Sequence, residues 1–391
     1  MKRSIPYARH SIHPKDIQAV TQVLQAGRIT QGPKIEEFEK AVSEFCGARE
    51  GVAVANGTAA LHAACFAAGI GPGDEVIVPP ITFAASANAV VYQEGKPVFA
   101  DVLPGSLLLD PEKAKAVVTP RTKAILAVDY AGQPCDYRAL REIADRHGLL
   151  LIADSCHALG AKYDGRNVGT LADLTAFSFH AVKHITTGEG GMVVTSKHEW
   201  ADRIRLFRNH GIASDEALRQ KQSTWYYEMT DLGFNYRITD IQCALGLSQL
   251  KRLPEWIARR REIAERYDEA FRPLSGVKPL GLLPTSLHVY HLYVVRFDRS
   301  KLGTDRAFVF KALREKGIGV NVHYIPVHLH PYYQKHFGTH PGLCPVAEQA
   351  YEEIISLPMF PDLTDDEQEY VISSVKDVVA EQEEKKTVRR R

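Results

Sequence analysis

The sequence predicts an α/β protein with a large domain, in which a mixed but mostly parallel sheet is sandwiched by helices, and a small C-terminal α+β domain. With 391 residues, 45% of them hydrophobic, the chain can bury a substantial core. Between residues 50 and 210, short apolar runs alternate with helical patterns, as in βαβ units. After residue 254 a long charged helix and a few short elements follow. We therefore expect residues 1–250 to form the large domain and residues 251–391 the small one.

The strands of the large domain are predicted from apolar runs of four to eight residues between helical patterns. Five of them are GVAVAN (51–56), EVIVPP (75–80), PVFADV (97–102), KAILAVDY (123–130) and LLLIADS (149–155). Two further runs, LTAFSFH (174–180) and GGMVVT (190–195), follow each other with no room for a crossover helix. Because parallel neighbours need such a crossover, we expect at least one strand of the sheet to be reversed.

The small domain is predicted to begin with a helix over EWIARRREIAERYDEAF (255–271), exposed and joining the two domains. HVYHLYVVRF (288–297) alternates like a half-buried strand, and IGVNVHYIP (318–326) is predicted to be another. Between them, DRAFVFKALREKG (305–317) has the pattern of an amphipathic helix that ends at Gly317.

Charge and cysteine usage exclude several classes of protein. Lys and Arg number 48 against 47 Asp and Glu, so no strong field draws the chain to nucleic acid or to an anionic membrane. The six cysteines have no CxxC spacing and are expected to be reduced thiols. No run of eighteen apolar residues and no secretory signal occurs. We expect a soluble, cytoplasmic protein.

Three features, in chain order, are candidates for parts of one functional site. A strand runs into residues 56–58 and then into an Ala-rich helix, whose free N–H groups suit a phosphate, although such a turn is common in α/β folds. Asp154 ends an apolar strand, where a carboxylate faces the ligand crevice, unless it only caps a turn. Lys183 follows a strand beside a Gly-rich turn and could attack a carbonyl, unless it is a surface amine. Together the three features supply a lysine for a Schiff base, an acid for a pyridine nitrogen and a site for a phosphate. This is the set that pyridoxal phosphate requires.

Four blocks of the sequence resemble the signatures of the DegT/DnrJ/StrS-type sugar-nucleotide aminotransferases, which are pyridoxal-phosphate enzymes of fold type I. The blocks are ANGTAALHAA (55–64), ADSCHALGAKYDGRNVGTLAD (153–173), SFHAVKHITTGEGG (178–191) and GFNYRITDIQCALGLSQL (233–250). The resemblance spans nearly the whole chain. It implies a pyridoxal 5'-phosphate cofactor that passes through its pyridoxamine phosphate form in turnover.

The resemblance also implies the roles of individual residues. Lys183 would carry the cofactor and move protons, and Asp154 would keep the ring nitrogen protonated. The phosphate would be bound by three residues of the same chain and by one from the neighbouring subunit of a homodimer with shared sites; these are Thr58, Ala59, Ser178 and, across the dimer, Asn235.

Two further side chains are implied to flank the cofactor ring. Phe83 matches the aromatic residue that stacks on one face, with ordinary core packing as the alternative. His157 matches the residue near the other side of the ring, although lone histidines are more often structural.

The substrate follows from finer resemblances. Lys183, where sugar dehydratases of the family have histidine, indicates transamination, with L-glutamate as the expected donor. The segments IPYARHSI (5–12), RITQGP (28–33) and VHYIPVHLHPYY (322–333) resemble the branch of the pseudaminic acid pathway that aminates the 4-keto carbon of UDP-2-acetamido-2,6-dideoxy-β-L-arabino-hex-4-ulose. The expected substrate-binding residues, each with a polar role at a domain interface as the alternative, are Arg237, His323, Tyr324 and His328.

Other interpretations stay open. The acceptor could be another nucleotide-linked keto sugar, such as a 4-keto-arabinose, a perosamine precursor or a 3-keto sugar. The chain could also be a non-catalytic, cofactor-binding regulatory protein of the same fold, which would never exchange an amino group with glutamate. A metal site at His323 and His328 is rejected, because no third ligand is placed.

Overall fold

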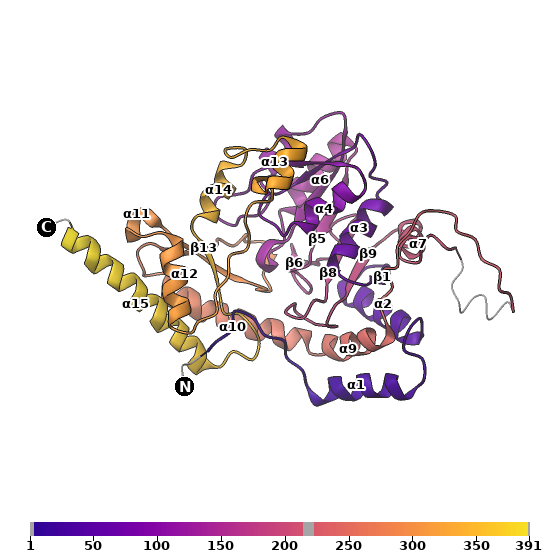
Figure 1. Ribbon diagram of the computed structural model, residues 1–391, viewed down its shortest axis with the longest axis horizontal. Coiled ribbons are helices and arrows are strands. Elements are labelled where there is room, and N and C mark those ends of the chain that lie inside the picture. Colours follow the sequence, from indigo (N-terminus) through magenta and orange to yellow (C-terminus); the bar gives the residue numbers. More distant parts are fainter. Residues whose placement is uncertain (1–3, 214–222, 390–391) are drawn as a thin grey trace.

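The computed structural model describes residues 4–213 and 223–389, and its centre is a seven-stranded sheet with helices on both faces (Figure 1). In spatial order the strands are β1 (Glu50–Val54), β9 (Gly191–Thr195), β8 (Leu174–Ser178), β5 (Leu150–Asp154), β4 (Thr122–Val128), β2 (Glu75–Val78) and β3 (Lys96–Phe99). Neighbouring strands pair in parallel except at β9, which is antiparallel to both β1 and β8. The predicted mixed, mostly parallel sheet with a reversed strand is confirmed.

Helices of the large part cover the sheet on two sides. They are α1 (Pro14–Gln25), α2 (Pro33–Cys46), α3 (Gly57–Ala67), α4 (Ala85–Tyr92), α5 (Pro111–Ala116), α6 (Tyr137–His147), α7 (His198–Phe207) and α9 (Asp240–Leu250). Helix α3 packs on β8 and β9 and contacts α4 and α7 on the same face. Its small alanine side chains are buried, which lets the helix approach the sheet closely. The crossovers through α4 and α6 run in opposite directions along the sheet, so right-handedness places these two helices on opposite faces.

Helix α10 (Leu253–Phe271) links the two hydrophobic clusters of the protein. Trp256 and Ile257 belong to the cluster around the large sheet, whereas Ile263 and Tyr267 belong to a second cluster. The prediction that this helix is exposed is wrong for its apolar face, because the apolar side chains on that face are buried in the two clusters. The predicted domain boundary after residue 250 stays a prediction.

The second cluster is built on a small antiparallel sheet and the helices around it. The sheet contains β10 (Val277–Pro279), β12 (Tyr293–Phe297) and β13 (Ile354–Leu357), and β11 (Ser286–Leu287), β6 (Lys162–Tyr163) and β7 (Arg166–Asn167) form a third, short sheet. The helices are α11 (Arg299–Leu302), α12 (Arg306–Glu315) and α15 (Asp365–Arg389), whereas α13 (Pro331–Phe337) and α14 (Pro345–Tyr351) pack on the cluster around the large sheet. The predicted helix before Gly317 is therefore confirmed as α12.

Two predicted strands of the small part differ from the structure. Residues 318–326 form no strand and make only isolated bridges, Ile318 to Ile5 and Asn321 to Ser356. The alternating apolar residues of this segment point into two different environments, so their period does not reflect a sheet. Of residues 288–297, only Tyr293–Phe297 is a strand, because residues 288–292 run along the large part instead.

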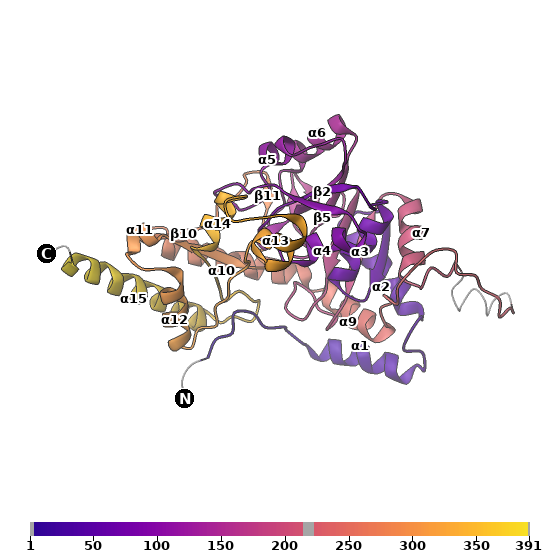
Figure 2. The same cartoon turned by 45° about the horizontal axis from the view of Figure 1, so that its top comes forward.

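Two segments leave the body of the molecule at opposite ends in both views (Figures 1 and 2). One is α15, and the other is an arm after α7, which comprises residues 209–213 and 223–235 of the described chain and is closed by bridges from Asn209 to Asn235 and from Ile212 to Met229. All six cysteines are free thiols. Within the described ranges, no helix has the length and apolar character that a bilayer span requires.

Candidate active site

The residues predicted to carry chemistry meet at one edge of the large sheet. Asp154 and Ser178 are the last residues of β5 and β8, and α3 begins directly after β1. These strands run parallel, so their carboxyl ends lie at the same edge, where α/β proteins bind ligands. The order of the strands thus brings together groups that are more than a hundred residues apart in the chain.

The start of α3 and Ser178 form a cradle for an anion. A Cβ atom on Gly57 would lie 2.8 Å from the Ser178 Cβ, so only glycine lets the two segments approach this closely. Asn56 caps the helix by accepting a hydrogen bond of 2.8 Å from the Ala59 N–H. The Ala59 N–H, expected to bind phosphate, is therefore used by the cap in this structure. Among the described residues, the N–H groups of Gly57 and Thr58 have no intrahelical partner and point from the positive end of the helix.

Asp154 is a buried carboxylate held at the centre of this edge. Its Oδ2 accepts a hydrogen bond of 2.5 Å from the Ser86 hydroxyl of α4, and its Oδ1 accepts one of 3.2 Å from the Cys156 N–H. The residue is 6% exposed. A buried carboxylate with so few partners needs a further cationic or N–H partner, which is what a protonated pyridine nitrogen provides.

Lys183 lies in the loop between β8 and β9 and is half-buried, so it is not a surface amine. Its Nζ is 3.4 Å from His291 Nε2. Burial lowers the pKa of the Lys183 amine, while Cys156 and Asp154 act in the opposite direction. A lysine with a lowered pKa is more often uncharged near neutral pH and is a better nucleophile and proton acceptor.

The predicted flanking residues gather around Tyr324. Its hydroxyl lies 3.1 Å from His157 Nε2, and its ring centroid lies 6.1 Å from that of Phe83. Phe83 is 61% exposed, which contradicts the alternative of core packing and leaves its ring available to a ligand. Burial, together with the charge of Lys183, holds the pKa of His157 well below its usual range, so this imidazole is neutral.

His323 adjoins the same cluster from the small sheet. Its Nδ1 lies 2.8 Å from the hydroxyl oxygen of Ser356, and the Tyr130 hydroxyl donates to its carbonyl oxygen. Burial lowers the pKa of His323 to about 4. The His323 side chain is therefore neutral, and its contact with Ser356 supports the segment that carries Tyr324.

Three of the predicted residues lie elsewhere. His328 is fully buried beside Phe99 of the edge strand β3, and its Nε2 lies 2.9 Å from Glu348. Since β3 is three strands from β5, roughly 14 Å separates it from the strand that carries Asp154. Asn235 is exposed at the base of the arm, and Arg237 donates a hydrogen bond of 2.8 Å to Asn209. Among the described contacts, none joins these three to Lys183.

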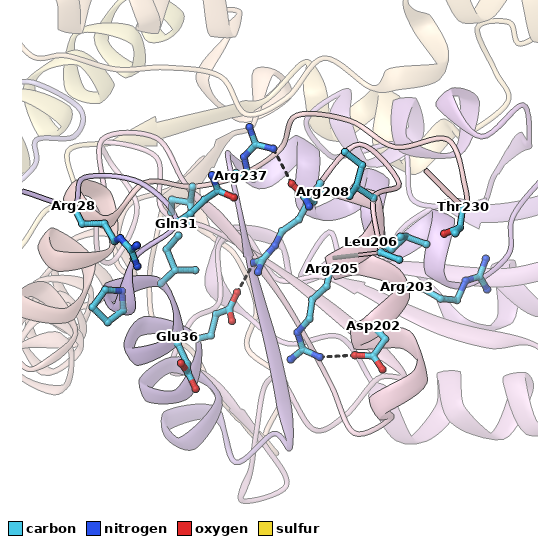
Figure 3. A pocket seen from close by; sticks show the side chains of 18 residues that line it. Arg28, Gln31, Glu36, Asp202, Arg203, Arg205, Leu206, Arg208, Thr230 and Arg237 are labelled. Carbon is cyan, nitrogen blue, oxygen red and sulfur yellow. Dashed lines mark hydrogen bonds and ion pairs between the residues drawn. The ribbon is translucent and has the colours of Figure 1, made fainter. Parts of the chain in front are cut away.

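Arg237 instead lines a cavity of about 940 Å³ between α2, α7 and the arm (Figure 3). The cavity contains several arginines, but Arg205 and Arg208 are paired with Asp202 and Glu39 on its wall. Lys183 and Asp154 are not among its lining residues. Within one chain, the cavity is thus separate from the site around Lys183 and Asp154.

Sequence analysis missed several contributors to the site, namely Ser86, Tyr130, Cys156 and His291. Three of them had a visible signal, because Tyr130 and His291 lie in segments that were predicted to be strands and Cys156 lies in a block that carries the family resemblance. Within the described part of the chain, no group of three or more His, Cys, Asp or Glu residues could hold a metal ion. The two histidines considered for a metal bind different partners, Ser356 and Glu348.

The buried carboxyl group of Asp129, close to the site, is expected to make the folding stability depend on pH. Its carboxylate accepts hydrogen bonds from the Ser155 hydroxyl (2.6 Å) and the Cys135 N–H (2.9 Å), yet burial raises its pKa to about 7. An unfolded aspartate has a pKa of about 3.9, so the folded protein binds more protons between about pH 4 and pH 7. In this window the contribution of Asp129 to folding stability falls as the pH rises.

We expect Asp129→Asn to remove this loss, which is on the order of a few kcal/mol across the window. The measurement is the midpoint of thermal unfolding from about pH 4 to about pH 8, and the variant should gain on the unmodified protein as the pH rises. Asp110→Asn, which alters an exposed helix cap, is the control. Parallel pH profiles for Asp129→Asn and the unmodified protein would contradict the assignment.

The residues at the edge of the sheet fit pyridoxal phosphate. The Gly57 and Thr58 N–H groups and Ser178 suit its phosphate, Asp154 suits its ring nitrogen, and Lys183 suits its aldehyde.

Comparisons with known proteins agree with the geometry. The model of the DegT/DnrJ/EryC1/StrS aminotransferase family matches residues 10–376. The spore coat polysaccharide biosynthesis protein SpsC of Bacillus subtilis is 44% identical over 377 residues, covering 96% of this chain and 97% of SpsC. Among solved structures, PseC of Helicobacter pylori, an aminotransferase involved in the biosynthesis of pseudoaminic acid, is 32% identical with a TM-score of 0.90, covering 97% of this chain and 100% of PseC. Spr1654 of Streptococcus pneumoniae in its PMP form is 32% identical with a TM-score of 0.91 over the same shares.

The family match covers most of the chain, and the similar structures include both the aldehyde and the amine form of the cofactor. The fold, the match and the placement of Lys183 and Asp154 thus agree. The chain belongs to the DegT/DnrJ/EryC1/StrS aminotransferase family and is a pyridoxal-phosphate-dependent sugar aminotransferase of fold type I.

Proposed function

We propose that the protein transfers the amino group of L-glutamate to the 4-keto carbon of UDP-2-acetamido-2,6-dideoxy-β-L-arabino-hex-4-ulose, a step of pseudaminic acid biosynthesis in the cytoplasm. The observation that carries the proposal is the convergence of Lys183, Asp154 and the start of α3 at one edge of the sheet. The similarity to PseC, whose name gives that pathway, supports the choice of sugar.

Each residue of the cluster has a role in this reaction. Pyridoxal phosphate supplies a ring that accepts electrons from the carbon that carries the amino group. Lys183 would take a proton at Nζ from that carbon of the donor and deliver it to the carbon that was the aldehyde of the cofactor, for which its lowered pKa suits it. Asp154 holds a proton at the ring nitrogen, and Phe83 covers the ring.

The sugar pocket is proposed to lie beside Tyr324, whose hydroxyl adjoins His157. His323 supports it from behind through Ser356. The buried position of His328 beside Glu348 offers it no access to a sugar in this chain. Arg237, in its own cavity, could meet the nucleotide diphosphate only in the site of a neighbouring subunit.

A second acceptor is favoured by one observation. SpsC, at 44% identity, is more similar in sequence than PseC, at 32%, and its name refers to a spore coat polysaccharide. The acceptor would then be another nucleotide-linked keto sugar destined for a surface polysaccharide. The cofactor chemistry would be the same, because the roles proposed for Lys183 and Asp154 concern the cofactor and the amino group that is transferred.

One experiment separates these acceptors. The purified protein is treated with L-glutamate, which should bleach the yellow absorbance of the aldehyde cofactor, and single UDP-linked keto sugars are then added. We expect the L-arabino-configured N-acetyl ketone to restore the colour fastest. Faster recovery with another keto sugar contradicts the proposed acceptor alone. A protein that L-glutamate never bleaches contradicts the donor.

We further propose that the protein works as a homodimer with shared sites. On the arm, Trp225, Met229 and Leu232 are 85%, 66% and 71% exposed, and such apolar surface is typically covered by a partner. Asn235 lies at the base of the same arm and contacts no cofactor-binding residue of its own chain among the described contacts. A second copy is the occupant that would bring Asn235 to a phosphate. The test is given in the Discussion.

A further inference from the structure

A buried histidine lies within hydrogen-bonding distance of the Lys183 amine. His291 precedes β12, is 5% exposed, and its Nε2 is 3.4 Å from Lys183 Nζ. No role was predicted for it from the sequence. The contact joins two segments far apart in the chain, since Lys183 belongs to the loop after β8 and His291 to the segment before β12 that runs along the large part.

The backbone around His291 is clamped from two sides. On one side, the Leu292 N–H donates to the Ala131 carbonyl at 3.2 Å. A Cβ atom on Gly132 would lie 3.0 Å from the backbone nitrogen of His291, so the two backbones are in close contact there. From the other side, Arg260 of α10 donates hydrogen bonds to the Tyr290 carbonyl at 3.1 Å and to the His291 carbonyl at 3.5 Å. The position of the imidazole is therefore set by the packing between the two parts of the protein and not by the strand alone.

The surroundings keep this imidazole neutral. Burial, with the charges of Lys183 and the neighbouring histidines, holds the pKa of His291 well below its usual range. The ring centroids of His157 and His184 lie 4.3 Å and 5.6 Å away. Asp154, at the end of β5, and Cys156 just after it both act to raise the pKa of Lys183. In the tautomer that carries its hydrogen on Nδ1, a neutral imidazole accepts a hydrogen bond at Nε2, and the lysine amine then donates in this contact.

We propose that His291 is a positioning residue that accepts a hydrogen bond from Lys183 Nζ and thereby fixes the direction of the amine. Fixing one N–H restricts the lone pair, with which the amine adds to an aldehyde carbon, to the two remaining positions on Nζ. In that addition Nζ gives up both of its hydrogens, a C=N bond forms, and the aldehyde oxygen leaves as water. The inference rests on the cofactor of the family and is independent of which sugar is used.

The test separates attachment to Lys183 from binding in the site. The apoprotein is mixed with pyridoxal phosphate, and the absorbance of the lysine-bound cofactor is followed in time. The affinity for pyridoxamine phosphate, which has no aldehyde to react with Lys183, is measured in parallel. For His291→Leu we expect attachment to slow about tenfold, as for one lost hydrogen bond, with unchanged affinity for pyridoxamine phosphate.

Two further variants make the result specific. In His291→Gln, an amide oxygen can replace the accepting nitrogen, and most of the rate should return. In His62→Leu, another buried histidine is removed that packs on Phe207 and Phe234, and attachment should keep its rate.

The proposal is overturned if His291→Leu attaches the cofactor at the original rate. An equal loss of affinity for pyridoxamine phosphate also overturns it, because that result indicates a structural role. A similar slowing of cofactor attachment in His62→Leu also overturns the proposal, because the effect would then not be specific to His291. If the unmodified protein attached no pyridoxal phosphate at all, the cofactor assignment itself would fail, which is a different outcome.

Discussion

Lys183→Ala is expected to lower the rate of amino-group transfer by at least about 10³-fold. The lysine is the only amine that the structure places beside Asp154 and the start of α3 within the described residues, so no neighbour can replace it as nucleophile and proton carrier. The variant should also lose the yellow colour of the lysine-bound cofactor. Steady-state kinetics with L-glutamate and the absorbance spectrum of the purified protein measure the two effects.

The fold of Lys183→Ala is expected to remain intact, because the side chain has no ion pair and a single long contact to His291. Circular dichroism and the midpoint of thermal unfolding check this. Lys40→Ala, which removes an exposed lysine 3.9 Å from Glu44, is the matched control and should keep full activity. Turnover retained in Lys183→Ala would rule out its assignment as the catalytic lysine.

Mixing Lys183→Ala with Asn235→Ala is expected to restore activity from two impaired proteins. If Asn235 acts on the neighbouring subunit, each mixed dimer contains one site with both residues intact. Random exchange of subunits makes about half of the dimers mixed, so about a quarter of all sites should become active. Initial rates at low cofactor concentration, before and after subunit exchange, measure the recovery.

The control for this experiment is a mixture of Lys183→Ala with Asp154→Asn. Lys183 and Asp154 belong to the same chain's cluster, so no combination of subunits rebuilds an intact site and no recovery is expected. Absence of recovery with Asn235→Ala would indicate sites built from a single chain. Equal recovery in both mixtures would show that the exchange assay does not report shared residues.

The position of Asp154 and Lys183 could be predicted because each is tied to a local pattern. Asp154 is the last residue of a fully apolar run, and such a run is a buried strand whose carboxyl end faces the ligand edge. Lys183 follows a second strand before a Gly-rich turn. The phosphate cradle was similarly visible in the passage from strand to Ala-rich helix.

Other contributors could not be predicted, since their role comes from packing between segments distant in the chain. Ser86 reaches Asp154 across 68 positions, and His291 reaches Lys183 across 108. The segment 318–326 shows the opposite failure, because its alternating residues indicated a strand where the structure has only isolated bridges. Period alone does not show whether a partner strand exists.

The sequence by itself determined the sheet, its reversed strand and the cofactor class, and it singled out Lys183 and Asp154 as the candidates to react with the cofactor. These follow from short-range patterns, which depend on local backbone preference and on which faces are apolar. Only the tertiary structure decided that His291 adjoins the Lys183 amine, that His328 is buried beside Glu348, and that Asn235 is exposed at the base of the arm. The physical reason is that these placements depend on how two hydrophobic clusters pack across α10, and that packing is set by contacts between residues with no local relation in the chain.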